Sequence, residues 1–166
     1  MMMDTFVDAE QFRAAMRRTA SSVGVLATDG AFGRAGLTVS SLSSLSAEPP
    51  SVLCCVHRQS RALEVLLGNG VFTANFLATG QSKVADVFAG FVAEHRENRF
   101  AVGEWKTLFT GAPALSGTIC SFDCRVAATF EFGTHRIIAG EVMALETGSD
   151  SPLVYSDRAY KQLVAG

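Results

Sequence analysis

Short hydroxyl side chains are concentrated between Gly36 and Pro50, where six of fifteen positions are Ser or Thr. Thr38, Ser40 and Ser41 carry donors and acceptors close to the backbone, so they can hold a polar ligand without filling the space that it needs. Serine-rich edge strands and ordinary turns have a similar composition. The run therefore indicates either a polar binding site or a structural segment, and both interpretations stay open at this point.

The four cysteines are spaced unlike the ligands of a zinc site. Cys54 and Cys55 are adjacent, and three residues rather than two separate Cys120 from Cys124. His57 adds a single imidazole, which leaves too few ligands for a metal. We predict no metal site and expect reduced thiols that are buried as small apolar side chains. The chain also lacks the glycine-rich dinucleotide and phosphate-loop motifs, H-E-x-x-H and G-x-S-x-G, which excludes several common classes of enzyme.

The composition favours one domain, residues 1–166, that associates with itself. Apolar residues make up 48% of the chain and charged residues only 18%. A chain of this length buries roughly 70% of its unfolded surface, which gives a core without disulfides or metals. The apolar excess predicts either a large core or a surface that a second copy covers, and we expect a homo-oligomer.

Charge and the first residues exclude other partners. The net charge is −2, and no basic run is longer than Arg17-Arg18, so a nucleic-acid partner is not expected. The N-terminus lacks the basic and long apolar regions of a signal peptide, and no stretch reaches the roughly 18 apolar residues of a membrane span. We therefore expect a cytoplasmic protein with no membrane partner.

The pattern of apolar residues predicts strands with helices at three places. Helices are expected after Asp8, over 60–67 and over 80–90, and the glycines at 30, 33 and 36 read as turn residues. Strands are expected over 23–28, 51–57, 71–77, 119–127, 128–132 and 136–145, whereas 103–113 reads as irregular. This order is typical of a mainly β (α+β) domain, as a β-barrel or an α+β sheet with a few peripheral helices.

Seven short motifs follow one another in a shared order. They are Phe12-Arg-Ala-Ala-Met16, Gly33-Arg-Ala-Gly-Leu-Thr-Val-Ser-Ser41, Ser46-Ala-Glu-Pro-Pro50, Asn75-Phe-Leu-Ala78, Arg99-Phe100 with Trp105, Ser121-Phe-Asp-Cys-Arg125 and Gly133-Thr-His135. Together they resemble the short-chain flavin reductases that serve as the small component of two-component monooxygenases, of the 4-hydroxyphenylacetate and pyrimidine-utilisation types. The resemblance implies a split β-barrel homodimer, an FMN-binding flavin-reductase-like fold, in which FMN or FAD lies near the subunit interface and is reduced by NADH or NADPH.

The resemblance also implies site residues. The hydroxyl-rich segment would lie along the flavin, the strand after Pro50 would pass it, and the next helix would offer its first N–H groups to a phosphate. His135 is expected beside the nicotinamide, where it would orient the dinucleotide or stabilise charge on the reduced ring. The expected cofactor-binding residues are Thr38, Val39, Ser40, Ser41, Ser46, Cys55, Val56, His57, Ser60, Arg61, Asn75, Leu77, Ala78 and Gln81.

Several of these residues also have a structural interpretation. Asn75 can satisfy a neighbouring backbone and Ser46 can cap a turn. Arg61 can be an exposed charge at a helix start, and His135 can close a hairpin. Which interpretation holds at each position depends on contacts that the sequence does not show.

The expected function is NAD(P)H-dependent reduction of FMN or FAD, which supplies reduced flavin to a partner monooxygenase. Hydride transfer needs no nucleophile or general base, in agreement with the lack of a carboxylate pair or catalytic triad. The alternatives are a reductase with bound flavin that passes electrons to ferric iron or a cobalt corrinoid, a non-catalytic flavin- or haem-binding module, and an enzyme like pyridoxamine-phosphate oxidase. The sequence leaves the choices of FMN or FAD and of NADH or NADPH open.

Overall fold

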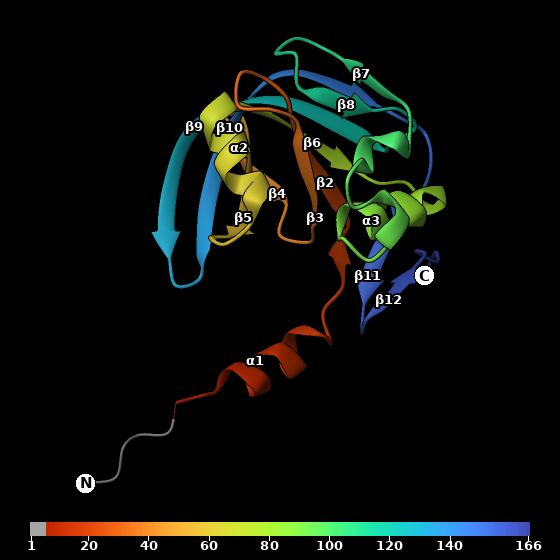
Figure 1. The fold of residues 1–166 in the computed structure, drawn as a ribbon. Helices are drawn as coiled ribbons and strands as arrows, with labels where there is room; N and C mark the ends of the chain where they lie inside the picture. Colours follow the sequence, from red (N-terminus) through yellow and green to blue (C-terminus); the bar gives the residue numbers. More distant parts are fainter. Residues whose placement is uncertain (1–5) are drawn as a thin grey trace, which may run out of the picture.

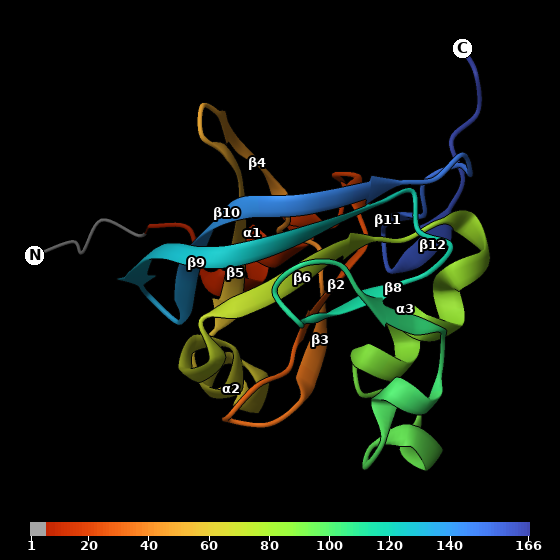
Figure 2. The ribbon, with the colours of Figure 1, turned by 90° about the horizontal axis from the view of Figure 1, so that it is seen from above.

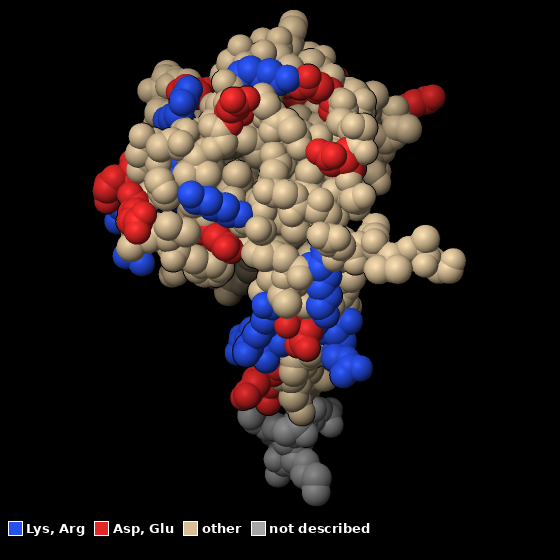
Figure 3. Space-filling model, turned by 90° about the vertical axis from the view of Figure 1, so that its right-hand side faces the viewer, with Lys and Arg blue, Asp and Glu red and all other residues tan. Residues whose placement is uncertain are grey.

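The N-terminal helix α1 (Ala9–Met16) begins at Asp8, as predicted. A capping box closes its first turn, because Asp8 Oδ1 accepts from the Gln11 backbone N–H at 2.8 Å and Gln11 Oε1 accepts from the Asp8 N–H at 3.1 Å. In the computed structural model, which describes residues 6–166, α1 projects from the body of strands (Figure 1). None of its residues is buried, so Phe12 and Met16 stay 59% and 49% exposed. Basic side chains gather over α1, whereas charges on the adjoining body are sparse (Figure 3).

Seven antiparallel strands form the main sheet, in the order β3-β2-β6-β9-β10-β5-β4. Their bounds are β2 (Gly24–Thr28), β3 (Ala35–Val39), β4 (Ser43–Ala47), β5 (Pro50–His57), β6 (Val71–Phe76), β9 (Cys120–Phe132) and β10 (His135–Thr147). Two small sheets contain β1 (Ser21–Ser22), β11 (Val154–Ser156) and β12 (Ala159–Lys161), and β7 (Trp105–Thr107) with β8 (Pro113–Leu115). The predicted mainly β class with few helices is confirmed.

The main sheet is curled, because its two edge strands are consecutive in the chain. β3 and β4 lie at opposite edges, yet only residues 40–42 join them. Six inter-strand spacings of about 4.8 Å would hold these edges about 29 Å apart in a flat sheet. The four Cα steps from Val39 to Ser43 span at most about 15 Å. The sheet must therefore wrap around its interior, although no ladder of hydrogen bonds joins β3 to β4 or β5 in the described residues.

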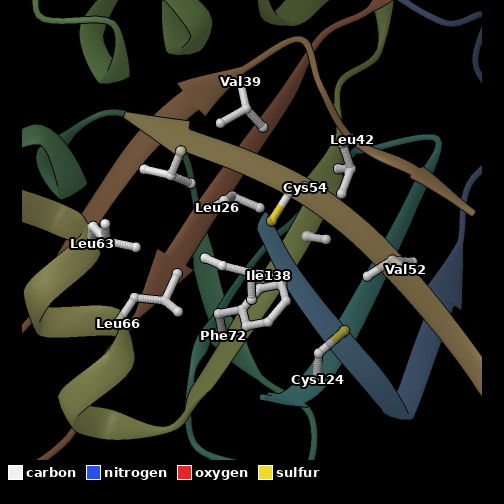
Figure 4. Packing of buried hydrophobic residues seen from close by; sticks show 12 residues of the cluster. Leu26, Val39, Leu42, Val52, Cys54, Leu63, Leu66, Phe72, Cys124 and Ile138 are labelled. Atoms are coloured by element: carbon white, nitrogen blue, oxygen red, sulfur yellow. The ribbon is translucent and has the colours of Figure 1, made fainter. Parts of the chain in front are cut away.

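The interior of the curled sheet is apolar. Leu26, Phe72 and Ile138 are fully buried there, and α2 (Arg61–Asn69) covers one end of the cluster with Leu63 and Leu66 (Figure 4). The helix ends before Gly70, whose φ of 72° is the left-handed conformation that glycine adopts without strain. The predicted helix over 60–67 is thus present and two residues longer at its end.

A second apolar cluster packs Val25 of β2 against α3 (Ser82–Phe88). Figure 2 shows α3 and α2 on opposite sides of β2 and β3. Helix α3 contributes Val84, Val87 and Phe88 to this cluster, and the short 3₁₀ helices η1 (Thr79–Gln81), η2 (Ala93–His95) and η3 (Arg99–Ala101) flank this helix in sequence. Gly36 was predicted as a turn residue but belongs to β3, where it pairs with Ala27. A Cβ at this position would come within 2.7 Å of the Phe88 ring, which explains the glycine. No described helix is long and apolar enough to cross a membrane.

Two predictions about the strands were wrong. The segment 103–113, predicted as irregular, contains β7, which pairs with β8. The predicted strands 119–127 and 128–132 are one strand, β9. Ala128 pairs with Ala139 and Val126 with Gly140, so Ala127 is the extra residue of a β-bulge. The bulge interrupts the alternation of side chains and accounts for the predicted break.

All four cysteines are free, and two are fully buried. Burial, together with the neighbouring Cys55, raises the pKa of the Cys54 thiol to about 12. Burial and then the nearby Asp123 and Cys54 raise the pKa of Cys124 to about 12. Cys54 and Cys124 are therefore neutral members of the core, as predicted, whereas Cys55 and Cys120 are only half-buried.

Candidate active site

Two imidazoles stand at the end of a half-exposed sheet face. His57 ends β5, His135 begins β10, and the register pairs them directly. Because paired residues and every second residue of a strand share a face, Cys55 and Ile137 lie on the same side as the imidazoles. Both are half-buried and form an apolar floor beside the histidines. The two ring centroids are 5.2 Å apart, with the ring planes at 73°.

Local hydrogen bonds fix one nitrogen of each ring. His57 Nδ1 accepts from the Gln59 backbone N–H at 3.2 Å, so a neutral His57 carries its proton on Nε2. His135 Nδ1 lies 2.8 Å from Thr134 Oγ1. Within the described part of the chain, neither Nε2 has a hydrogen-bond partner, and both are free to bind a ligand.

Ser41 attaches the hydroxyl-rich segment to this face. Its Oγ accepts from the Cys55 backbone N–H at 3.0 Å and donates to the Cys55 carbonyl at 2.9 Å. The side chain thus connects the two strands two residues beyond the last β4–β5 pair, Ser43 with Leu53. Ser46 also bonds locally, because its Oγ accepts from the N–H of Glu48 and lies 3.1 Å from the Glu48 carbonyl oxygen. Ser46 therefore caps the turn before Pro49, and its structural interpretation is the one that the geometry supports.

Thr38, Val39 and Ser40 lie elsewhere, along a cavity of about 190 Å³ that Tyr155 and Tyr160 also line. Thr38 Oγ1 donates to the Ala85 carbonyl at 2.6 Å, so its proton is used by α3. Ser40 is exposed. Ser60 and Arg61 line a different cavity, so the structure does not bring Thr38, Val39 and Ser40 together with them.

A larger cavity of about 570 Å³ begins one turn beyond the imidazole pair, where the Ser60 backbone N–H donates to the His57 carbonyl at 3.0 Å. Ser60 precedes α2, whose first N–H groups suit an anion. Strongly basic residues surround this opening. Its lining consists of Arg34, Ala35, Gly36, Ser60, Arg61, Ala62, Arg96, Glu97, Asn98, Arg99 and Phe100.

Asn75, one of the residues expected to bind the cofactor, is part of the core. Asn75 is fully buried, and its Nδ2 donates to the Val25 carbonyl and to Thr73 Oγ1, both at 2.9 Å. Its Oδ1 accepts from the Leu115 N–H at 3.0 Å and from Ser121 Oγ at 2.9 Å. Both polar atoms of the Asn75 side chain are therefore hydrogen-bonded inside the protein, which supports its structural interpretation.

Other residues that were expected to bind the cofactor are also buried or bonded within the protein. Leu77 and Ala78 are 1% and 3% exposed, and Val56 is buried in the first cluster. Gln81 Oε1 accepts from the Ala78 N–H at 3.0 Å, and its Nε2 donates to the Ser116 carbonyl at 2.9 Å. These side chains hold the framework of the sheet and do not face either cavity.

Sequence reasoning predicted Arg61 but missed the three other arginines that line the larger cavity. Arg99-Phe100 was recognised as part of a motif without a role, and Arg34 as part of the glycine-rich motif. Arg96 carried no signal, since it lies in a charged loop whose position depends on the tertiary fold. The arrangement offers a flat apolar floor, two free imidazole nitrogens and a cationic cavity next to a helix start.

Comparison with known proteins identifies the family of this chain. The family model described as flavin reductase like domain matches residues 16–164, so the chain belongs to that family. Both the family and the enzyme class predicted from the seven motifs are confirmed.

Individual relatives agree over nearly the whole chain. The FMN reductase (NADH) RutF of Ancylobacter novellus is 41% identical over 161 residues, which are 96% of this chain and 87% of that protein. Among solved structures, a Haemophilus somnus 129pt protein described as a flavin reductase has a TM-score of 0.89 at 33% identity, over 95% of this chain and 100% of that one. BorF, the flavin reductase component of a bacterial two-component tryptophan halogenase, has a TM-score of 0.84 at 26% identity, over 96% of this chain and 100% of that one.

Proposed function

We propose that this protein transfers a hydride from NADH to FMN or FAD, with the flavin on the half-exposed face that ends at His57 and His135. The observation that carries the proposal is the floor of Cys55 and Ile137 beside two imidazoles with free Nε2 atoms. A flavin ring is flat and largely apolar with a polar edge, which matches a floor of this kind. NADH as the donor and FMN as the acceptor are supported by the printed activity of the Ancylobacter relative.

The residues of this protein bind the flavin and the nicotinamide and orient them for hydride transfer. The proton that a neutral His57 holds on Nε2 can be donated to an acceptor on the ring edge, and His135 can orient the nicotinamide. Ser41 keeps β5 in register beneath the ring, and Ser60 with Arg61 offers backbone N–H groups and a cation to the phosphate. When bound, the flavin supplies the hydride acceptor, so no side chain needs to act as a nucleophile.

We further propose that reduced flavin leaves this protein and reaches a separate oxygenase. The floor is open toward solvent in one subunit, which suits a flavin that exchanges during turnover. BorF, which serves as a reductase component, supports this interpretation.

We also propose that two split-barrel subunits associate into a homodimer. The curled sheet with its short link over residues 40–42 supports the split barrel. Phe130 and Phe132, at the tip of the β9–β10 hairpin, are 59% and 82% exposed, and the register places Phe132 opposite His135. Since α1 also has no buried residue, a second copy is expected to cover both apolar surfaces and to add a wall beside the flavin face.

The decisive experiment follows the absorbance of NADH and of NADPH under air, each with FMN, with FAD and without added flavin. We expect rapid oxidation of NADH that requires added flavin. Oxidation without added flavin, by protein that retains a yellow cofactor, would contradict flavin exchange and favour a reductase for another acceptor. Flavin binding without any oxidation of NADH or NADPH would overturn the proposed activity and leave a binding module.

A further inference from the structure

Asn69, the last residue of α2, is hydrogen-bonded to the connection between β2 and β3. Its Nδ2 donates to the Gly33 carbonyl at 2.9 Å and to Thr28 Oγ1 at 3.0 Å, and its Oδ1 accepts from the Phe32 N–H at 2.9 Å. Both donors and the carbonyl oxygen of this amide are therefore used on one loop, residues 29–34, and on the end of the strand before it.

Two glycines allow the loop to lie directly against the end of the helix. A Cβ at Gly30 would come within 2.6 Å of Asn69 Oδ1, and a Cβ at Gly68 would come within 2.5 Å of the Phe32 ring. Such close approach is a reason for glycine at both positions. The loop is thus packed on α2 as well as bonded to it.

The same loop carries Arg34 into the wall of the cavity of about 570 Å³. Arg34 Nε pairs with Asp29 Oδ2 at 3.0 Å, and its guanidinium carbon lies 5.0 Å from the centroid of the Phe100 ring, in η3. Among the described residues, the two Nη groups of Arg34 make no hydrogen bond, so they are available to an anion. The loop therefore joins α2, through Asn69, to η3, through Arg34.

We propose that Asn69 is a positioning residue for this cavity, because it fixes the loop on α2 and thereby places the Arg34 guanidinium in the wall. The inference rests on the proposed function, in which Ser60 and Arg61 of the same cavity bind the flavin phosphate. Without the amide, Arg34 keeps its charge but occupies more positions. Ordering it around a bound anion then costs binding free energy.

Limited digestion with trypsin tests the loop without any ligand. Trypsin cleaves after arginine, and we expect Asn69→Ala to be cut after Arg34 about fivefold faster or more under native conditions, because the loop opens locally. Mass spectrometry identifies the cut. Thr110→Val is the matched control, since Thr110 Oγ1 anchors another loop by donating to Asp123 and accepting from the Ala112 N–H. It should be cut after Arg34 as the wild type is.

FMN binding, measured without NADH by quenching of flavin fluorescence, tests whether Asn69 acts through Arg34. We expect Asn69→Ala and Arg34→Gln each to bind FMN about threefold more weakly or worse, and Thr110→Val to bind it within twofold of the wild type. The double variant should bind no more weakly than Arg34→Gln alone, because the two residues form one unit. A general loss of stability would instead leave the two effects independent.

The proposal is overturned if Asn69→Ala is cut after Arg34 at the wild-type rate, if neither single variant weakens FMN binding, or if the two losses multiply in the double variant. An Asn69→Ala protein that circular dichroism shows to be unfolded would also overturn it, because the amide would then serve the whole fold. Neither readout involves NADH oxidation, so these outcomes are separate from a failure of the reductase activity.

Discussion

His57 and His135 face each other across β5 and β10 with ring centroids 5.2 Å apart, and each has its Nδ1 engaged by a neighbour in its own turn. The backbone of Gln59 fixes one ring and the hydroxyl of Thr134 the other. Both imidazoles therefore present Nε2 to the same half-exposed face. This relationship makes the pair a positioned unit rather than two independent surface histidines.

Replacement of His135 by Ala tests its role toward the nicotinamide. We expect kcat/KM for NADH to fall by about 10²-fold, the size of effect that a lost positioning contact can have. Stopped-flow reduction of FMN by NADH measures it. His95→Ala removes a histidine outside the pair and is expected to keep wild-type rates; equal rates in both variants would remove His135 from the site.

Ser41 is expected to matter for stability through its two bonds to Cys55. Ser41→Ala leaves the Cys55 N–H and carbonyl without these partners, so the free energy of unfolding should fall by about 1–3 kcal/mol. Urea unfolding followed by circular dichroism measures the change. Ser44→Ala, on the exposed strand β4, is the control and should change stability little; similar losses in the two variants would contradict this role.

Asn75 is predicted to be a structural residue. Asn75→Leu would remove four buried hydrogen bonds and should cost about 3 kcal/mol or more. Thermal unfolding of the variant and of the exposed control Asn98→Ala gives the comparison. A stable Asn75→Leu protein that had lost only flavin affinity would show instead that the amide serves the cofactor.

The buried thiols predict a loss of stability at high pH. Cys54 and Cys124 have pKa values of about 12, against 9.0 for an ordinary thiol. Between these values the unfolded chain releases protons that the folded protein keeps, so the free energy of unfolding falls as the pH rises. Each thiol contributes about 1.4 kcal/mol per pH unit in this window.

Urea unfolding at several values from about pH 8 to pH 11 measures this slope. Cys54→Ala should reduce the slope of unfolding free energy against pH by the contribution of one thiol, about 1.4 kcal/mol per pH unit. The lower starting stability of the variant is subtracted before the slopes are compared. Burial and the hydrogen bond to Asp86 also raise the pKa of Tyr160, which adds a decline in the same direction above its ordinary value of 10.0. A stability that stays constant across the window would refute the neutral, buried state of the thiols.

The exposed face of α1 predicts a contact between subunits. Phe12→Glu places a charge where a second copy is expected, so the dimer should dissociate at micromolar concentrations while the circular dichroism spectrum is retained. Light scattering after gel filtration gives the molecular mass. Phe109→Glu alters an equally exposed loop residue away from α1 and should remain dimeric, and an unchanged mass for Phe12→Glu would exclude α1 from the interface.

The features that the sequence predicted correctly depend on local signals. Asp8 and Gln11 cap a helix through contacts three residues apart, and the apolar run before His57 forms the strand β5 as its composition indicates. The buried hydrogen bonds of Asn75 were not apparent in the sequence, because three of its four partners come from other parts of the chain. Arg34, Arg96 and Arg99 meet only because the tertiary fold brings a hairpin and a loop together. The spacing of apolar residues along the sequence does not show such a contact.

The position of β9 and β10 between β6 and β5 has a consequence for synthesis of the chain. When the ribosome has released β2 to β6, β5 and β6 each still lack a neighbour that lies about fifty or more residues downstream. The N-terminal half therefore emerges with two open strand edges, and it can complete its sheet only after the last hairpin has left the exit tunnel. Nascent chains stalled before residue 120 should be protease-sensitive and bound by chaperones, whereas chains released beyond β10 should resist digestion.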